Sequence, residues 1–225
     1  YAFQSSLHIT KSSISNNLTR GSYGGGLYYY SAQTIDDQDS LEVGNSSFIG
    51  NQSYDNGGGV HANVTYGKAT FTNVLFAKNK AGESSYNKTA GLFSITPNAG
   101  IIRVINNTFV SNEGDNTVNF SGSGTREMIN TIVWHNTNTA HPVLVGTASY
   151  SNIEGVYTGT GNLNTDPAFA DYVNGDYHLA DSSPSLGTGT ATGAPTTDIE
   201  GNIRPNPAGT NPDMGAYESA KSTRV

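Results

Sequence analysis

A row of basic side chains is the part of this sequence best suited to chemistry on a polysaccharide. Lys78 and His135 each stand directly before an asparagine of a repeated pattern, and Ser111 holds that place in the repeat between them. In stacked strands the two backbones lie about two strand spacings, or ~10 Å, apart. A polysaccharide lyase needs such a base beside a uronate carboxyl, and a cation such as Arg103 to stabilise the charge that forms. Solvated surface residues explain the row at least as well, and we favour them.

Acidic side chains gather after residue 160 and have the chemistry of a calcium site. Asp166, Asp198 and Asp213 offer carboxylate oxygens, and Ca²⁺ takes about six to eight oxygen ligands. The alternative is an ionic network in which Arg204 makes a bidentate contact with Asp198 or Glu218. We favour the network and keep Ca²⁺ as the one cofactor that the sequence suggests.

The chain is rich in tyrosine, with 13 residues, and three of them are consecutive at 28–30. In a strand, alternation sends at least one of these three outward. Exposed tyrosine rings beside asparagine and aspartate suit stacking on sugars, because the side chain has an apolar body and a polar tip. Packing along strand edges is the alternative. The candidate ligand-binding residues are Tyr23, Tyr28, Tyr30, Tyr54 and Tyr66.

The elements that must position these side chains follow a repeated sequence pattern. In it a bulky apolar residue precedes an asparagine by three positions, as Phe48 precedes Asn51. Such near-periodic self-similarity indicates a repeat architecture. In stacked repeats an inward asparagine can hydrogen-bond its own backbone and the neighbouring amide. We therefore favour a structural ladder over a carbohydrate-binding groove for this column. The ladder residues are Asn17, Asn51, Asn79, Asn112 and Asn136.

Each repeat begins with alternating apolar and polar residues, as a strand with one buried face should. Leu41 with Val43, and Ile102 with Val104, are examples. A small-residue segment and a further strand follow the asparagine. Residues 1–160 are therefore predicted to form an all-β, right-handed parallel β-helix (a solenoid) of about five to seven coils. A β-propeller or sandwich is the alternative, but its strands would be more evenly spaced.

From residue 161 the pattern changes to a stretch rich in proline, glycine and aspartate, with few strand-like runs. A solenoid needs a distinct terminal cap, because an open last coil exposes strand edges and core. Residues 161–225 are therefore predicted to be an irregular C-terminal cap of the same solenoid and not an independent domain.

Composition excludes several classes of function. The formal charge is −7 and the 11 lysines and arginines form no run, which argues against nucleic-acid binding. Without cysteine there are no disulfides, cysteine-based zinc sites or thiol catalysis. No apolar stretch is long enough to span a membrane. The chain opens at Tyr1 inside an incomplete repeat and without a signal peptide, which is typical of a mature or trimmed piece of a longer product.

The C-terminal segment carries motifs that resemble those of a known family. NTDPAF at 164–169, DYHLADSSPSLGTG at 176–189, DIEGNIRP at 198–205 and DMGAYE at 213–218 resemble the ending of secreted bacterial β-helix proteins called choice-of-anchor Q proteins. The repeats are similar to the bacterial right-handed parallel β-helix family, including proteins with polymorphic-outer-membrane-protein-like repeats. The resemblance covers nearly the whole chain and implies an extracellular or cell-surface location. It implies no catalytic set.

These observations predict an exported or cell-surface β-helix module with a structural, adhesive or glycan-binding role. The expected partner is a polysaccharide, a cell-surface glycan or another cell-surface protein. The alternative is a polysaccharide lyase or hydrolase, or the C-terminal part of one. Residues 164–166 imitate one polygalacturonase motif, but its other Asp pair and its Gly-His-Gly are missing. We therefore favour a protein without catalytic activity.

Overall fold

The computed structural model describes residues 2–3, 6–20, 23–31, 39–82, 88–96, 98–137, 143–144, 146–155 and 157–220. These residues form strands and turns, and no helix occurs among them. Accordingly, no helix in this part of the chain has the length and apolar character that crossing a membrane requires.

Strands from successive repeats pair side by side in three parallel sheets. The six-stranded sheet runs β1 (Ala2–Phe3), β5 (Leu27–Tyr30), β8 (Val60–Asn63), β11 (Thr89–Thr96), β14 (Asn116–Gly122) and β17 (Val143–Leu144). The three-stranded sheet consists of β4 (Leu18–Thr19), β7 (Gln52–Ser53) and β10 (Lys80–Ala81).

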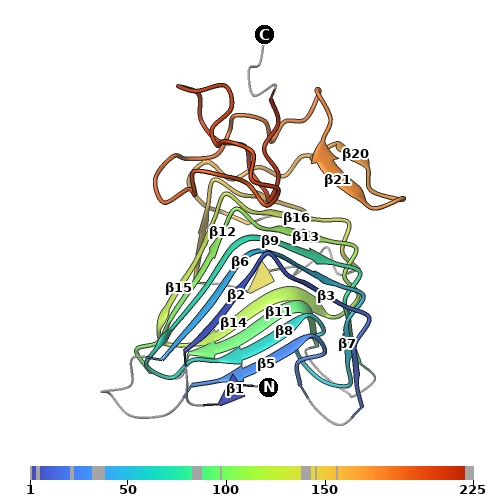
Figure 1. The fold of residues 1–225 in the computed structure, drawn as a ribbon, viewed down its shortest axis with the longest axis vertical. Coiled ribbons are helices and arrows are strands. Elements are labelled where there is room, and N and C mark those ends of the chain that lie inside the picture. Colours follow the sequence, from blue (N-terminus) through green and yellow to red (C-terminus); the bar gives the residue numbers. More distant parts are fainter. Residues whose placement is uncertain are drawn as a thin grey trace.

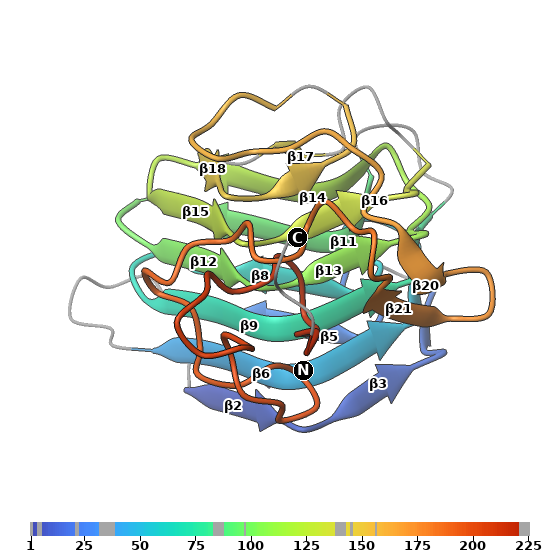
Figure 2. The ribbon, with the colours of Figure 1, turned by 90° about the horizontal axis from the view of Figure 1, so that it is seen from above.

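The ten-stranded sheet contains two long strands, β6 (Ser40–Ile49) and β9 (Lys68–Ala77), and elsewhere pairs of shorter ones. The short strands are β2 (Leu7–Thr10) with β3 (Ser13–Ser15), β12 (Ile101–Ile105) with β13 (Thr108–Val110), β15 (Thr125–Ile129) with β16 (Ile132–Trp134), and β18 (Thr147–Ser149) with β19 (Asn152–Ile153). Figure 2 shows these strands lying one above another in repeat order.

The register places equivalent residues of successive repeats beside each other. Phe48 pairs with Phe76, and Phe76 pairs with Phe109. The rings of Phe48 and Phe76 stack with centroids 5.3 Å apart and 9° between their planes. Those of Phe76 and Phe109 stack at 4.5 Å and 3°. The predicted all-β fold with parallel strands is therefore confirmed.

The main apolar core lies between the six-stranded and ten-stranded sheets, which curl toward each other (Figure 1). Alternation along the strands selects its members: Leu41 and Val43 of β6 are buried, whereas Glu42 between them is exposed. Other members are Leu27, Tyr29, Val60, Phe71, Leu92, Ile102, Val118 and Met128.

A ladder of asparagine side chains runs along this core. Asn79 Nδ2 donates to the Phe48 carbonyl over 2.8 Å, and Asn79 Oδ1 accepts the backbone N–H of Asn51 over 3.0 Å. Each amide therefore ties its own repeat to the one before, which fixes the register. The side-chain donors and acceptors run Asn17, Asn51, Asn79, Asn112 and Asn136, with N···O distances of 2.9, 3.1, 3.0 and 3.0 Å.

Residues 157–165 close the last repeat. The backbone N–H of Ser151 donates to Asn162 Oδ1, and that of Ile153 donates to the Leu163 carbonyl, both over 3.0 Å. Tyr157 packs against the main core from this end. This short stretch covers the last strand edge as a cap should.

The remaining segment, residues 166–220, lies along the flank of the stack and not over its end. In Figure 1 it runs, orange to red, above the ten-stranded sheet. It includes one antiparallel hairpin, β20 (Phe169–Asp171) with β21 (Asp176–Leu179). Side-chain amides of three repeats reach its backbone: Asn73, Asn106 and Asn130 donate to the carbonyls of Thr197, Asp213 and Thr190 over 2.7, 3.0 and 2.8 Å.

The later repeats need this cover because their strands are apolar on both faces. In β9, Phe76 faces the main core while Leu75 and Ala77 lie in a second apolar cluster with Tyr177. Ile132 and Trp134 of β16 likewise pack with Met214 of the flanking segment in a third cluster. The flanking position thus follows from outward apolar residues and not from the exposed end.

Candidate functional site

One outward column of the ten-stranded sheet changes from polar to apolar along the stack. Its members in successive repeats are Ser13, Ser47, Leu75, Thr108 and Ile132. The flanking segment covers the last three, since Leu75 and Ile132 belong to the second and third clusters and Thr108 Oγ1 accepts the Ala216 N–H over 3.0 Å. Ser13 and Ser47 face a groove instead.

This flank groove has a volume of about 760 Å³ and separates the first two repeats from the flanking segment. Residues 11–13 and 45–47 form its repeat wall. Residues 197, 199–201 and Tyr217 form the segment wall. The outward side chains of the first two repeats are polar, so the flanking segment does not pack on them. A groove therefore stays open between the two.

A sharp bend of the backbone in each of the first two repeats shapes the repeat wall. Lys11 and Asn45 have φ values of 47° and 48°, a left-handed conformation in which asparagine is unusually common. The N–H of Ser12 donates to Ser46 Oγ over 3.1 Å, which ties the two rows together. Among the described residues, the Lys11 amino group and Asn45 Nδ2 have no hydrogen-bond or ion-pair partner, so both are available to a ligand.

The segment wall presents a carboxylate and an aromatic ring. A hydrogen bond of 3.0 Å from the Ile199 N–H to the Ala216 carbonyl joins the two stretches that carry Glu200 and Tyr217. The Tyr217 ring lies 4.4 Å from that of His178. Burial, aided by nearby carboxylates, raises the pKa of Tyr217 to about 12, so its hydroxyl keeps its proton at neutral pH.

His178 connects this wall to the β20–β21 hairpin. Its Nδ1 lies 2.6 Å from Asp176 Oδ1, and its Nε2 lies 3.2 Å from Glu200 Oε2. Burial lowers the pKa of His178, but the two carboxylates together outweigh burial and raise it. The imidazole thus neutralises part of the negative charge at the groove's edge.

A buried ionic network fixes the segment wall. Arg204 Nε lies 3.0 Å from Glu218 Oε2, and Asp198 Oδ1 accepts the N–H of Glu200 over 2.9 Å. Burial lowers the pKa of Arg204 although three carboxylates oppose the change. Burial, helped by the charge of Asp213, raises the pKa of Glu218 to about 7. The network holds Glu200 and Tyr217 in place but lies beneath them.

The carboxylates considered for calcium have other partners. Asp198 and Asp213 are buried in this network, and Asp213 accepts the N–H groups of Gly187 and Ser219. Asp166 lies apart and accepts the Ala168 N–H over 2.8 Å. No group of three or more His, Asp or Glu side chains in the described part of the chain is arranged to hold a metal ion.

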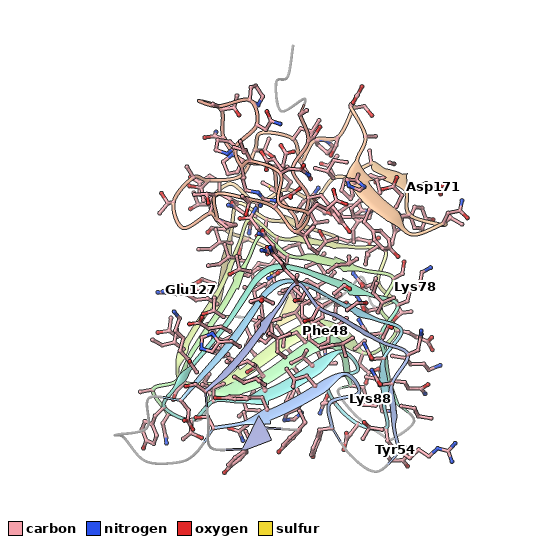
Figure 3. The ribbon with its side chains drawn as sticks, viewed as in Figure 1. Phe48, Tyr54, Lys78, Lys88, Glu127 and Asp171 are labelled. Carbon is pink, nitrogen blue, oxygen red and sulfur yellow. The ribbon has the colours of Figure 1, made fainter. Side chains whose placement is uncertain are left out.

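The basic residues considered for catalysis do not converge. Lys78 and His135 keep equivalent positions, each with a φ of 55°. His135 stacks on Tyr172 with ring centroids 4.1 Å apart. Arg103 pairs with Glu127 over 2.8 Å. Figure 3 shows Glu127 and Lys78 on opposite flanks, so Arg103 cannot serve the same substrate as Lys78.

Some of the tyrosines considered for ligand binding come together on the six-stranded sheet. Tyr28 lies in a row with His61 and Phe93, with centroids 5.2 and 4.9 Å apart, and Tyr23 lies 4.5 Å from His61. Burial lowers the pKa of His61 to about 4. Tyr30 is half-buried two residues beyond Tyr28 on the same face.

The other two tyrosines lie elsewhere. Tyr54 is 47% exposed and lines a separate pocket of about 340 Å³ with Leu18, beside the three-stranded sheet. Tyr66 lies in the turn between β8 and β9. The five predicted tyrosines therefore do not form one site, and none lines the flank groove.

The groove residues carried a sequence signal that the prediction did not use. Lys-Ser-Ser at 11–13 and Asn-Ser-Ser at 45–47 occupy the same place in the first two repeats. In the third repeat Asn-Val-Leu at 73–75 replaces them. This loss of outward hydroxyls marks where the cover begins and hence where the open surface ends.

Comparison with known proteins adds no assignment: no family model matches the chain, and neither the curated proteins nor the solved structures searched give a match.

Proposed function

We propose that this chain is a right-handed parallel β-helix of an exported or cell-surface protein and that it binds glycans through the flank groove. Curled parallel sheets with in-register repeats support the β-helix. The motifs at 164–169 and 213–218 that resemble choice-of-anchor Q proteins support the family and the location. The repeats serve as the rigid body that carries the binding surface.

The composition of the groove is the observation that carries the proposal. Hydroxyls, an amide, an amino group and a carboxylate line the groove together with one aromatic ring. Amides and charged groups donate to or accept from sugar hydroxyls, and an aromatic ring packs on the apolar face of a pyranose. A hydroxyl-rich ligand therefore matches both kinds of surface, whereas an apolar ligand would leave the Lys11 amino group and Asn45 Nδ2 without partners.

Catalysis is not part of the proposal. Lys78 and Arg103 lie on opposite flanks, so a base and a cation do not face one substrate. Retention and cleavage are therefore measured together. The protein is passed over a panel of immobilised neutral and acidic polysaccharides, and new unsaturated ends are recorded by ultraviolet absorbance.

Two variants with a matched control locate the site. Tyr217→Ala removes the groove's ring, and Lys11→Ala removes its amino group. Tyr172→Ala is the control, since this tyrosine packs on His135 outside the groove. We expect a polysaccharide to retain the native chain and the control but to lose both groove variants. Equal retention of all four chains would refute the groove as the site, and new unsaturated ends would refute a purely binding role.

A further inference from the structure

We propose that the flank groove binds an uncharged, extended, β-linked polysaccharide that runs along the stack, with one sugar on each of two repeats. This inference rests on the proposed glycan-binding function and specifies its ligand. It follows from the spacing of the rows, the closed end of the groove, its charge and its ring.

The spacing of the repeat wall matches a polymer of pyranoses. Ser13 pairs with Ser47 in parallel register, so the two rows repeat at one strand spacing, ~4.8 Å. An extended β-linked chain advances by a similar length with each sugar. Both rows have a polar residue at the bend followed by two serines, and the second serine of each row, Ser13 or Ser47, faces the groove, whereas Ser46 is buried. Successive sugars along the stack would therefore meet the same kinds of donor and acceptor.

The groove ends at the third repeat. Asn73 Nδ2 donates to Asn45 Oδ1 over 2.9 Å and to the Thr197 carbonyl over 2.7 Å, so it joins the two walls. Leu75 takes the place of Ser47 there and is covered. Asn73 Oδ1 is buried at this end without a hydrogen-bond partner among the described residues. Two rows, and hence two sugar positions, are what the groove offers.

The charges of the groove favour a neutral chain. Lys11 on one wall and Glu200 on the other cancel, and His178 offsets Asp176 beside them. A polyanion would meet Lys11 but also Glu200 and a chain of formal charge −7. A polycation would be repelled by Lys11, and the carboxylate that could attract it, Glu200, already pairs with His178. Neutral hydroxyls can hydrogen-bond to both walls without meeting a like charge.

The Tyr217 ring selects the shape of the sugar. Its packing on His178 fixes its orientation at the edge of the groove. A fixed ring packs best on a pyranose with equatorial hydroxyls, because such a sugar has a flat face of C–H groups. β-linked glucose or N-acetylglucosamine chains present this face, whereas α-linked chains coil away from a straight wall.

A length series tests the inference. Glucose and the β-1,4-linked di-, tri- and hexasaccharides of glucose and of N-acetylglucosamine are titrated by calorimetry. We expect affinity to rise about tenfold or more from one sugar to two, since the second sugar gains a row of hydrogen bonds, and then to level off. Ser47→Leu should abolish that rise, because it places in the second row the residue type that Leu75 provides in the third.

Ser40→Leu is the matched control, since Ser40 lies on β6 outside the groove lining. Equal melting temperatures show that both variants fold. Binding of a neutral glycan without a step at the disaccharide, or with the step retained in Ser47→Leu, would refute the two-row geometry but leave glycan binding intact. Tighter binding of an acidic polysaccharide, lost at high salt, would refute the neutral ligand. Retention of no glycan at all would refute the proposed function itself.

Discussion

Replacing Asn79 with alanine should destabilise the protein severely, although the change removes only one small amide. The side chain is fully buried and makes four hydrogen bonds. Nδ2 donates to the Phe48 carbonyl and to Asn112 Oδ1, while Oδ1 accepts from the backbone and side-chain N–H groups of Asn51. At about 1 kcal/mol of net stability each, their loss costs about 4 kcal/mol.

Two further variants separate hydrogen bonding from packing. Asn79→Leu keeps the volume filled but leaves the same buried groups without partners, so it should cost at least as much as alanine. Asn17→Ala changes the exposed end of the ladder, where the side chain donates to Asn51 Oδ1 over 2.9 Å and has no other side-chain hydrogen bond to the described residues. That change should cost below about 1 kcal/mol, because water replaces the lost partner.

Urea unfolding followed by circular dichroism measures the three differences. The free energy of unfolding should fall most for the two Asn79 variants and least for the Asn17 variant. If Asn79→Leu proved as stable as the native chain, the ladder would be a packing feature and its hydrogen bonds would contribute nothing to register.

Three further outcomes are expected. The folded pKa of Glu218, about 7, exceeds the ordinary 4.5, so the folded state holds the proton more tightly and stability should fall as pH rises from about 4.5 to 7. Glu218→Gln should remove that slope in urea unfolding at several pH values, and an unchanged slope would contradict the assignment. The folded pKa of His61, about 4, lies below the ordinary 6.5, so the protein should lose stability as pH falls between these values, by about 2 kcal/mol near pH 5. His61→Phe should abolish this loss because phenylalanine does not titrate, and the next repeat already has a phenylalanine, Phe93, at the paired position. A melting temperature of the variant that still falls between pH 6.5 and 4 would count against this reasoning. Gly59→Ala should lower the free energy of unfolding by about 1–3 kcal/mol, since the new Cβ would lie 2.7 Å from a carbonyl oxygen of the next repeat. Gly44→Ala should be close to neutral in the same urea assay, because no atom lies nearer than 3.9 Å to its Cβ. Equal losses for the two variants would refute the steric explanation.

Much of the fold was predictable from the sequence because stacking puts like residues in contact. Phe48, Phe76 and Phe109 recur at one position of the pattern, and this recurrence is visible without coordinates. Parallel pairing in register then follows, since any other register would separate the like residues. Alternation within each strand, as in 41–43, predicts which side chains are buried.

The flanking segment and its groove were not predictable in the same way. The hydrogen bond between Asn73 and Thr197 joins residues 124 positions apart, and no local pattern encodes such a contact. A stretch rich in proline, glycine and aspartate indicates an irregular conformation but not which surface it covers. Leu75 and Ile132 are apolar where the first two repeats have serine, and this signal of a lateral cover was not used in the prediction. The roles assigned to the tyrosines remain predictions.

The lateral attachment of residues 166–220 has a mechanical consequence. Separate hydrogen bonds from Asn73, Asn106 and Asn130 fasten the segment to three repeats. A pull applied near residue 220 along the stack would strain these bonds together, in shear. A segment seated only on the last strand would instead peel away one bond at a time. Sideways fastening therefore spreads tension over three repeats, so no single hydrogen bond carries the load alone.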